Sequence, residues 1–389
     1  MKIGIVTHYY KSLNYGGNLQ AYALCKYLND IGHDAMQIPY DRSADAGFLN
    51  NQSFLSVQTC RIRRMLARTY RRFIATLKKN DKGTLSSEFK VRHQRLYEFN
   101  QKDIPHTSKI YNHRNIKEVN GIFDAFITGS DQVWHPSAVC GAYFLDFAKP
   151  TKLKISYAAS IAVDEIDKVY LKRYEQSLKT FSAVSVREEN SISIIKDISP
   201  VEVVATLDPT LLLSKEQWET VCSPRLITDD YIFCYFLGDD KAHRDTVAEF
   251  AKLKNMKIVT MPNLHGTVRE CDNDFGDEQL YDISPLDFLS LVKYSQYTFT
   301  DSFHASVFSL LFEKEFFAFK RNSGKDMGVR LRNLTELFDL QCRYCDSNEK
   351  STINYIMSQN EINYSVEFKK FNEMKRRSIA FLDTALKAD

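Results

Sequence analysis

The sequence predicts an α/β fold built from parallel sheets, and three observations support this prediction. Short apolar runs of strand length alternate with amphipathic helical segments over most of the 389 residues. Polar, mostly helical sequence interrupts this alternation near 43–117, and the alternation restarts after Asp208-Pro209-Thr210. Hydrophobic residues make up 44% of the chain, which is enough for two cores. We therefore expect two Rossmann-like domains, residues 1–210 and 211–389, that face each other across a cleft.

The first half opens with a β-α-β unit, which requires parallel strands. Residues 2–7 form a buried apolar strand, a glycine-bearing loop spans Asn14 to Asn18, and apolar residues recur at helical spacing over 19–31. Gly32 ends this helix, and a second strand follows at 35–38. Later apolar runs predict strands at 123–128, 154–158, 183–186 and 201–207, with a helix at 166–180.

The second half resumes the alternation of strands and helices. Strands are predicted at 231–237, 257–260, 297–300 and 316–319, and helices at 241–252, 285–294 and 305–312. In open parallel sheets, ligands bind beyond the carboxyl ends of the strands. Polar turns fall at four such ends, and we take them as the candidate functional site: 14–18, 129–134, 187–190 and 301–304.

The composition excludes several classes of protein. The net charge of +3 is too small to indicate nucleic-acid binding, and no RNA-binding motif of aromatic residues and glycines is present. The eight cysteines are scattered, as in reduced cytosolic proteins, and the isolated Cys342-Arg-Tyr-Cys345 pair predicts neither zinc nor redox chemistry. No apolar run reaches about 18 residues and no signal peptide is recognised, so we expect a cytoplasmic protein.

The turn Asp301-Ser302-Phe303-His304 joins a strand to an apolar helix and places a histidine at the N-terminus of that helix. The first N–H groups of a helix have no partner within it, and they attract phosphates and carboxylates. Histidine changes charge near neutral pH, so His304 could protonate an anion bound there. The alternative is structural: Asp301 or Ser302 caps the helix, and His304 is hydrogen-bonded and inert.

Two other turns carry groups suited to ligand binding. In Asn14-Tyr15-Gly16-Gly17-Asn18 the glycines would let backbone N–H groups approach a ligand, unless Asn18 only caps the next helix. Gly129-Ser130-Asp131-Gln132-Val133-Trp134 offers a carboxylate, an amide and an indole, a combination that can grip a sugar. In the structural alternative, Trp134 packs in the core.

Basic residues mark three further features. Arg187 leaves a buried strand and suits a carboxylate or phosphate, although a salt bridge to a neighbouring glutamate would also satisfy it. The segment from Arg61 to Lys79 predicts a basic amphipathic helix, which would lie on an anionic membrane surface or dock on its own domain. A basic wall follows the strand at 316–319, and one or two of its members are expected to contact ligand: Lys320, Arg321, Lys325, Arg330 and Arg332.

Taken together, these segments resemble the polysaccharide pyruvyl transferase family. The resemblance implies a two-domain fold like that of the B-type glycosyltransferases. It also implies transfer of the enolpyruvyl unit of phosphoenolpyruvate to two hydroxyls of a sugar, giving a cyclic pyruvate ketal. It implies no metal and no cofactor besides this co-substrate. The motifs that carry it occur in family order over almost the whole chain: Asn14-Tyr15-Gly16-Gly17-Asn18-Leu19-Gln20, Gly129-Ser130-Asp131-Gln132-Val133-Trp134, Ser156-Tyr157-Ala158-Ala159-Ser160, Ser185-Val186-Arg187-Glu188, Asp208-Pro209-Thr210-Leu211-Leu212 and Asp301-Ser302-Phe303-His304.

The resemblance implies roles for individual residues. His304 would be the general acid, and Arg187 and Lys320 would hold the donor. The planar fork of Arg187 suits the donor carboxylate and the point charge of Lys320 suits its phosphate, although the two could exchange roles. Asp131 or Asp301 could orient or deprotonate the attacking hydroxyl, and the spacing does not choose between them.

Further contacts are assigned to the two sides of the cleft. The donor lies on the side of residues 211–389 and is expected to contact Arg321, Asn14, Gly17 and Ser302 as well. The acceptor, a sugar that is expected to be part of a lipid-linked oligosaccharide, lies on the side of residues 1–210 and contacts Asn18, Gln132 and Trp134. An enzyme with such an acceptor would work in the cytoplasm, peripherally on the inner membrane face.

The sequence departs from the family pattern in two places. Ala305 stands where glycine is usual and could narrow the space beside the donor, and Ser160-Ile161-Ala162 replaces a more usual serine-phenylalanine-glycine. Two alternative functions stay open: a nucleotide-sugar-dependent glycosyltransferase of similar fold, and a non-catalytic glycan-binding relative. Intact His304, Arg187 and Lys320 count against the non-catalytic alternative.

Overall fold

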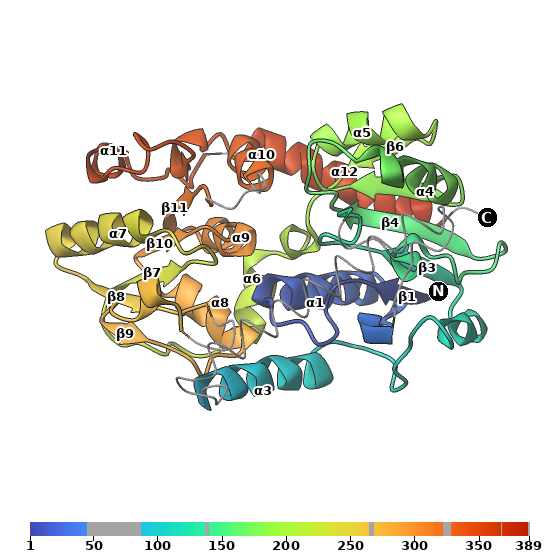
Figure 1. Cartoon of the computed structure of the whole chain (residues 1–389), viewed down its shortest axis with the longest axis horizontal. Helices are drawn as coiled ribbons and strands as arrows, with labels where there is room; N and C mark the ends of the chain where they lie inside the picture. The colour runs from blue at the N-terminus through green and yellow to red at the C-terminus, as the bar shows by residue number, and fades with distance from the viewer. Residues whose placement is uncertain (45–86, 137–139, 264–267, 322–327, 367, 388–389) are drawn as a thin grey trace.

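The computed structural model describes residues 1–44, 87–136, 140–263, 268–321, 328–366 and 368–387. Within these ranges the chain forms two six-stranded parallel sheets with flanking helices, and the sheets lie side by side along the long axis of the molecule (Figure 1). This arrangement confirms the predicted α/β fold. None of the helices in these ranges is long and apolar enough to span a membrane.

The first sheet has the strand order β2-β1-β3-β4-β5-β6. Its strands are β1 (Lys2–Val6), β2 (Asp34–Gln37), β3 (Ala125–Thr128), β4 (Leu153–Ala159), β5 (Ala183–Val186) and β6 (Val203–Ala205). It is accompanied by the helices α1 (Tyr15–Asp30), α3 (Ser87–Lys102), α4 (Lys168–Leu178) and α5 (Asn190–Ile198). The order reverses between β1 and β3, so the loops after these strands border the crevice where ligands bind in such sheets.

The second sheet has the strand order β12-β11-β10-β7-β8-β9, which reverses between β7 and β10. Its strands are β7 (Tyr231–Tyr235), β8 (Lys257–Thr260), β9 (Glu278–Gln279), β10 (Tyr297–Thr300), β11 (Glu315–Phe319) and β12 (Tyr344–Cys345). Its helices are α6 (Lys215–Val221), α7 (Lys241–Lys254), α8 (Pro285–Lys293), α9 (Phe303–Leu311), α10 (Val329–Leu337) and α11 (Ile353–Met357). The sequence does not predict β9 and β12, because strands of two residues leave no apolar pattern.

Helix α1 begins earlier than the sequence predicts. The side-chain oxygen of Asn14 accepts a hydrogen bond from the Gly17 N–H at 3.2 Å and caps the helix, which starts at Tyr15. The predicted glycine loop from Asn14 to Asn18 is therefore the buried first turn of α1. Helix α9 also begins two residues early, because Ser302 is its N-cap.

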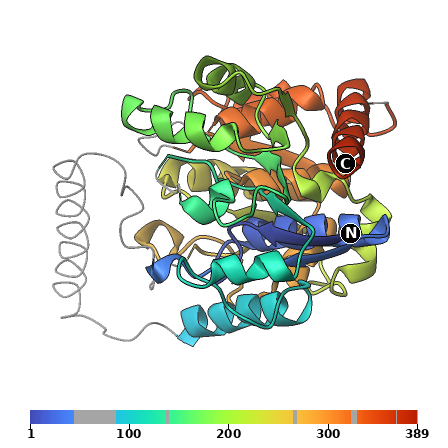
Figure 2. The same cartoon turned by 90° about the vertical axis from the view of Figure 1, so that its right-hand side faces the viewer.

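The last helix, α12 (Lys369–Ala385), returns to the first sheet. Leu382 and Ala385 pack with Ile3 and Ile5 in one hydrophobic core. The N-terminal and C-terminal segments consequently lie on the same side of the molecule (Figure 2). The division near residue 210 stays a prediction, and a helix from the second half completes a core of the first.

Two expectations from the sequence fall outside the described ranges. The basic segment from Arg61 to Lys79 and the basic-wall residue Lys325 belong to 45–86 and 322–327, which the structure does not describe. The hypothesis of an anionic membrane surface stays a prediction.

Candidate functional site

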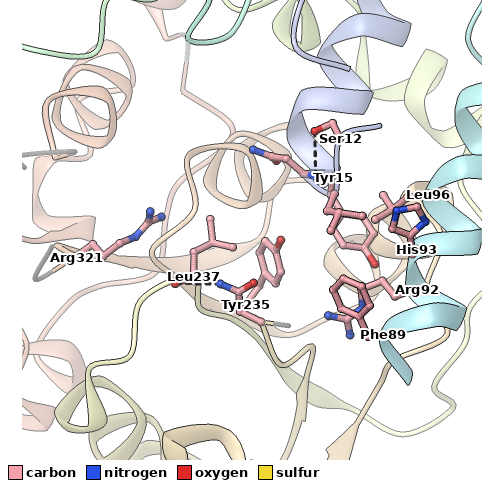
Figure 3. Close-up of a pocket in the computed structure, with 12 residues that line it drawn as sticks. Ser12, Tyr15, Phe89, Arg92, His93, Leu96, Tyr235, Leu237 and Arg321 are labelled. Carbon is pink, nitrogen blue, oxygen red and sulfur yellow. Dashed lines mark hydrogen bonds between the residues drawn. The ribbon is translucent and has the colours of Figure 1, made fainter. Parts of the chain in front are cut away.

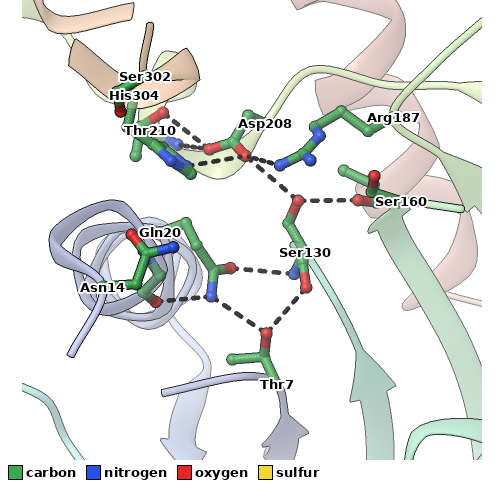
Figure 4. A network of polar contacts seen from close by, with 12 residues as sticks. Thr7, Asn14, Gln20, Ser130, Ser160, Arg187, Asp208, Thr210, Ser302 and His304 are labelled. Carbon is green, nitrogen blue, oxygen red and sulfur yellow. Dashed lines mark hydrogen bonds and ion pairs between the residues drawn. The ribbon is translucent and has the colours of Figure 1, made fainter. Parts of the chain in front are cut away.

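Polar side chains from both sheets meet where the carboxyl ends of their strands face each other (Figure 4). His304 lies in the first turn of α9, after β10, and is only 5% exposed. Its Nε2 atom lies 3.5 Å from Oδ2 of Asp208, which follows β6 in the other sheet. The predicted helix-terminal histidine is thus confirmed in position, and its neighbour across the cleft is a buried carboxylate.

Asp208 is held in its ionised form. Burial would raise its pKa, but His304, then Arg187 and Thr210, hold it well below its ordinary value. Its Oδ1 accepts hydrogen bonds from the N–H and hydroxyl of Thr210, and its Oδ2 accepts one from Ser130 at 3.3 Å. An ionised carboxylate in this place stabilises a positively charged imidazole. Asp208 is a site residue without a predicted role, although the motif Asp208-Pro209-Thr210 was the available signal.

A buried network fixes Ser130 beside Asp208 (Figure 4). Gln20, on α1, donates from Nε2 to the Thr7 hydroxyl at 3.1 Å and accepts from the Ser130 N–H at 3.1 Å. Thr7 in turn donates to the Ser130 carbonyl at 2.8 Å. Because all three residues are buried, the network holds the turn after β3 in one geometry.

Arg187 enters the site already paired. Its Nη1 donates to Asp208 at 2.8 Å and its Nε to Glu188 at 3.2 Å, while Nη2 is buried without a hydrogen-bond partner. Burial alone would lower its pKa, but the carboxylates of Glu188, Asp208 and Asp131 raise it above its ordinary value. Arg187 therefore lies where the sequence predicts, with its Nη2 left for a ligand and its charge compensated.

The structure separates the two carboxylates between which the spacing did not choose. Asp301 accepts from the N–H groups of Leu237 at 2.7 Å and Gly238 at 2.6 Å, and from Arg321 at 3.3 Å. Asp131, after β3, receives a hydrogen bond on its carboxylate from no described residue. Asp301 therefore organises the loop after β7, and Asp131 is the carboxylate available to a substrate.

Asp131 is nevertheless ionised. It is 7% exposed, and burial would raise its pKa. Positive charge outweighs burial and lowers the pKa, and Arg187 contributes most. The same carboxylate lies close to the helix start of α1, because a Cβ on Gly17 would come within 3.4 Å of its Oδ2. A base and a histidine thus face one small space.

Gly16 gives His304 the room it occupies. A Cβ built on Gly16 would lie 1.9 Å from Nδ1 of His304 and 2.2 Å from its Cγ. Such distances are far inside van der Waals contact, so only glycine fits here without displacing the imidazole. The glycine turn was predicted to let another group approach its backbone closely. The group that approaches Gly16 is the His304 imidazole, which belongs to the other sheet.

The residues predicted to contact the acceptor do not line an open surface. Trp134 is 0% exposed, stacks on Phe144 at 5.7 Å between ring centroids, and donates from Nε1 to the Tyr143 carbonyl. Asn18 is also 0% exposed and donates to the Ser12 carbonyl at 3.3 Å. Trp134 corrects the predicted acceptor contact, because its ring and its indole N–H are taken up by packing in the core. Asn18 lies in the buried first turn of α1 and its Oδ1 has no hydrogen-bond partner, so its acceptor contact stays a prediction.

The predicted basic wall reaches the site only in part. Lys320 donates its backbone N–H to Cys345 at 2.9 Å, and its side chain contacts no described partner of the site. Arg321 turns back to the carbonyl and carboxylate of Asp301. Arg330 faces Gln132, whose amide oxygen accepts from both Nη atoms at 3.2 Å when the amide is oriented toward it. The predicted phosphate contact of Lys320 stays a prediction.

His8, which follows β1, is a site residue that sequence reasoning missed. Its ring stacks on Tyr143 with 4.6 Å between centroids, and its Nε2 is buried without a partner. Burial lowers its pKa to about 4, with Asp131 opposing this effect and Arg42 and His135 adding to it. His8 is therefore neutral at physiological pH. Its place directly after the first strand was the available signal.

We expect His8 to make the fold less stable in mild acid. Its pKa of about 4 lies below the ordinary 6.5, so the unfolded chain binds a proton in that window that the folded chain does not. Stability is therefore lost as pH falls from about 6.5 toward 4, by on the order of 2 kcal/mol at pH 5. His8→Phe keeps the ring stack and removes the titration. Urea unfolding at pH 7.5 and 5 should show a smaller decline for His8→Phe, and an equal decline would contradict the assignment.

Two cavities are lined by residues from both halves of the chain. One, of about 390 Å³, lies between the start of α1, α3 and the loop after β7, and three rings, Tyr15, Phe89 and Tyr235, lie around it (Figure 3). Amide groups of Asn14 and Asn263 also line it. The other, of about 410 Å³, lies against α10 and α12. It is lined by Arg187, Asp208, Phe303 and Arg330 among others.

Metal ligands do not gather in the part of the chain that the structure describes. Across these ranges, no group of three or more histidine, cysteine, aspartate or glutamate side chains is arranged to hold a metal ion.

Comparisons with known proteins support the fold described above and identify the family that the chain resembles. A model of the polysaccharide pyruvyl transferase family matches residues 14–323. The UDP-GlcNAc 2-epimerase of Methanocaldococcus jannaschii superposes with a TM-score of 0.55 at 12% identity, covering 98% of this chain and 100% of that chain. The UDP-GlcNAc 2-epimerase of Neisseria meningitidis bound to UDP-GlcNAc gives a TM-score of 0.51 at 11% identity, covering all of both chains. A search of curated proteins gives no match. The structural likeness shows a shared fold of two Rossmann-like domains, as predicted.

Proposed function

The chain belongs to the polysaccharide pyruvyl transferase family, and from this premise we propose that it transfers the enolpyruvyl group of phosphoenolpyruvate to two hydroxyls of one sugar. The products are a cyclic pyruvate ketal and phosphate. One observation carries the proposal: His304 lies 3.5 Å from the ionised Asp208, in the same small space as Asp131, whose carboxylate no described residue engages. In this proposal His304 is the acid and Asp131 is the base.

The first step in this proposal is protonation of the donor. His304 delivers a proton to the methylene carbon of phosphoenolpyruvate, which becomes a methyl group and leaves an oxocarbenium-like centre next to the carboxylate. Asp208 contacts Nε2 and stabilises the charged imidazole before the transfer. The proton then leaves from Nδ1, the nitrogen on the side of Gly16.

The second step is addition of the sugar. One hydroxyl attacks the oxocarbenium-like centre and gives its proton to Asp131, from which His304 can be recharged. The C–O bond to phosphate then breaks, a second hydroxyl closes the ketal ring, and its proton leaves with the phosphate. The two hydroxyl protons thus account for the new methyl hydrogen and for the proton on the phosphate.

The acceptor side of the proposal is the cavity of about 390 Å³ (Figure 3). Aromatic rings such as Phe89 and Tyr235 can pack on the C–H faces of a pyranose, and the amides of Asn14 and Asn263 can meet its hydroxyls. This cavity takes over the role expected for Trp134. A lipid-linked acceptor, presented at the inner membrane face to the basic segment from Arg61 to Lys79, remains part of the proposal.

The alternative, a nucleotide-sugar-dependent glycosyltransferase, is disfavoured by Asp301. In a Rossmann-like sheet the N–H groups after the first strand receive the phosphates of a nucleotide. In the second sheet, the Leu237 and Gly238 N–H groups already donate to the Asp301 carboxylate. A diphosphate would have to displace this carboxylate against like-charge repulsion. The second alternative, a non-catalytic glycan-binding protein, would not require the buried pair of His304 and Asp208.

The proposal is tested by product analysis. Lipid-linked oligosaccharides from polysaccharide-producing bacteria are incubated with the enzyme and phosphoenolpyruvate, and examined by mass spectrometry and phosphate release. A ketal adds one pyruvate less one water to the glycan, with one phosphate released for each ketal. Saturable binding of UDP-sugars with no binding of phosphoenolpyruvate would instead establish the glycosyltransferase.

A further inference from the structure

Arg330 brings a buried positive charge into the site, and it forms no ion pair with a carboxylate of the described residues; Asp131 and Glu188 act on its charge only from a longer distance. Its Nη1 and Nη2 atoms donate to the neutral Gln132 amide at 3.2 Å, once the amide oxygen is turned toward them. Its Nε atom is buried and has no hydrogen-bond partner. The guanidinium is thus held in place by a neutral amide, without a carboxylate at hydrogen-bonding distance among the described residues.

Arg187 contrasts with Arg330 at this point of the site. Arg187 donates to both Asp208 and Glu188, and only its Nη2 is unpartnered. Both guanidinium groups lie over the ring of Phe303, with Cζ at 4.7 Å for Arg187 and 5.9 Å for Arg330. Both arginines therefore contact one ring. Arg187 is ion-paired with described carboxylates, and Arg330 forms no described ion pair.

The position of Arg330 is electrostatically costly. Burial, followed by the charge of Arg187, lowers the Arg330 pKa to about 10, so the group is still charged at neutral pH. A buried cation beside a second cation is unfavourable unless an anion joins them. The cavity of about 410 Å³ against α10 and α12 is lined by both arginines and gives an anion room to approach.

We propose that Arg330 binds the phosphate group of the donor and that Gln132 positions its guanidinium. This inference rests on the proposed pyruvyl transferase function. The phosphate carries most of the donor's negative charge, and Arg330 supplies a positive charge outside any described ion pair and an unpartnered N–H. Arg187, whose Nη2 has no partner, binds the donor carboxylate. Arg330 thereby takes the role that the sequence had indicated for Lys320.

The experiment measures binding of phosphoenolpyruvate by isothermal titration calorimetry to the full-length wild type and to Arg330→Gln, Arg330→Lys and Arg114→Gln. Arg114 is exposed and lies outside the basic wall and the site, so Arg114→Gln is the control. Circular dichroism checks the fold of each variant. Inorganic phosphate and pyruvate, each at saturating concentration, serve as separate competitors.

We expect Arg330→Gln to weaken phosphoenolpyruvate binding by about 10- to 100-fold, the size of a lost charge-assisted hydrogen bond to an anion. Arg330→Lys should recover part of this loss, and Arg114→Gln should bind as the wild type does. Competition by phosphate should weaken in Arg330→Gln while competition by pyruvate stays unchanged.

Two results would overturn the inference alone: unchanged affinity in Arg330→Gln, or a loss confined to pyruvate competition, which would place Arg330 at the carboxylate. Wild-type protein that fails to bind phosphoenolpyruvate would instead overturn the proposed function. The two failures are therefore distinguishable.

Discussion

Replacing His304 with alanine is expected to reduce kcat by about 10²- to 10⁴-fold, the range that one general acid contributes. The reason is that the enol ether must gain a proton on carbon, and the imidazole beside Asp208 is the group placed to give it. Binding of phosphoenolpyruvate should change much less than kcat, because the arginines that hold the donor are untouched. Phosphate release with a saturating acceptor measures kcat, and calorimetry measures donor binding.

The matched control is His113→Ala, since His113 is an exposed histidine far along the chain from the cluster. Its turnover should equal that of the wild type. Full turnover in His304→Ala, with its fold intact by circular dichroism, would remove the acid assignment. A loss of donor binding as large as the loss of kcat would show that His304 serves binding and not protonation.

Replacing Gly16 with alanine is expected to have the second-largest effect on activity. The new Cβ would lie 1.9 Å from Nδ1 of His304, so the imidazole or the start of α1 must move. A displacement of about 1 Å in a catalytic group can cost about 100-fold in rate. Overpacking at a buried position should also lower the free energy of unfolding by about 1–3 kcal/mol. Phosphate release and urea unfolding measure the two effects separately.

Gly121→Ala supplies the control for this substitution. No atom lies within 4 Å of a Cβ at Gly121, so the same chemical change should leave rate and stability near wild-type values. The double variant Gly16→Ala with His304→Ala should recover much of the lost stability, because the clashing ring is gone, while turnover stays low. If Gly16→Ala were as active and stable as the wild type, His304 would not occupy the position described.

The sequence predicted secondary structure well wherever hydrophobic patterning decides it. The buried runs at 123–128, 231–237 and 297–300 became β3, β7 and β10, because a strand covered on both faces needs apolar residues throughout. The predictions were less accurate where a single hydrogen bond determines the first residue of a helix. The cap at Asn14 converted a predicted glycine loop into the first turn of α1.

Some of the site residues could be predicted from the sequence, and others could not. His304 and Arg187 were found from the sequence because each follows a strand at the edge where ligands bind. Asp208 and His8 were missed as site residues, although both also follow strands, since an aspartate before a proline and a histidine in a turn have ordinary structural explanations. Trp134 was assigned to the acceptor although its ring lies in the core.

The sequence by itself determined the two parallel sheets, the edges at which their ligands bind, and the family to which the chain belongs. These follow from patterns that are local along the chain or from motifs in a fixed order. Only the tertiary structure decided which charges remain free. Asp301 and Arg187 are engaged by Gly238 and Asp208, whereas Asp131 and Arg330 meet no opposite charge at hydrogen-bonding distance among the described residues. The physical reason is that the partners of these charged groups come from the other sheet or from distant loops. The spacing of residues along the sequence does not indicate which of these groups lie together in the fold.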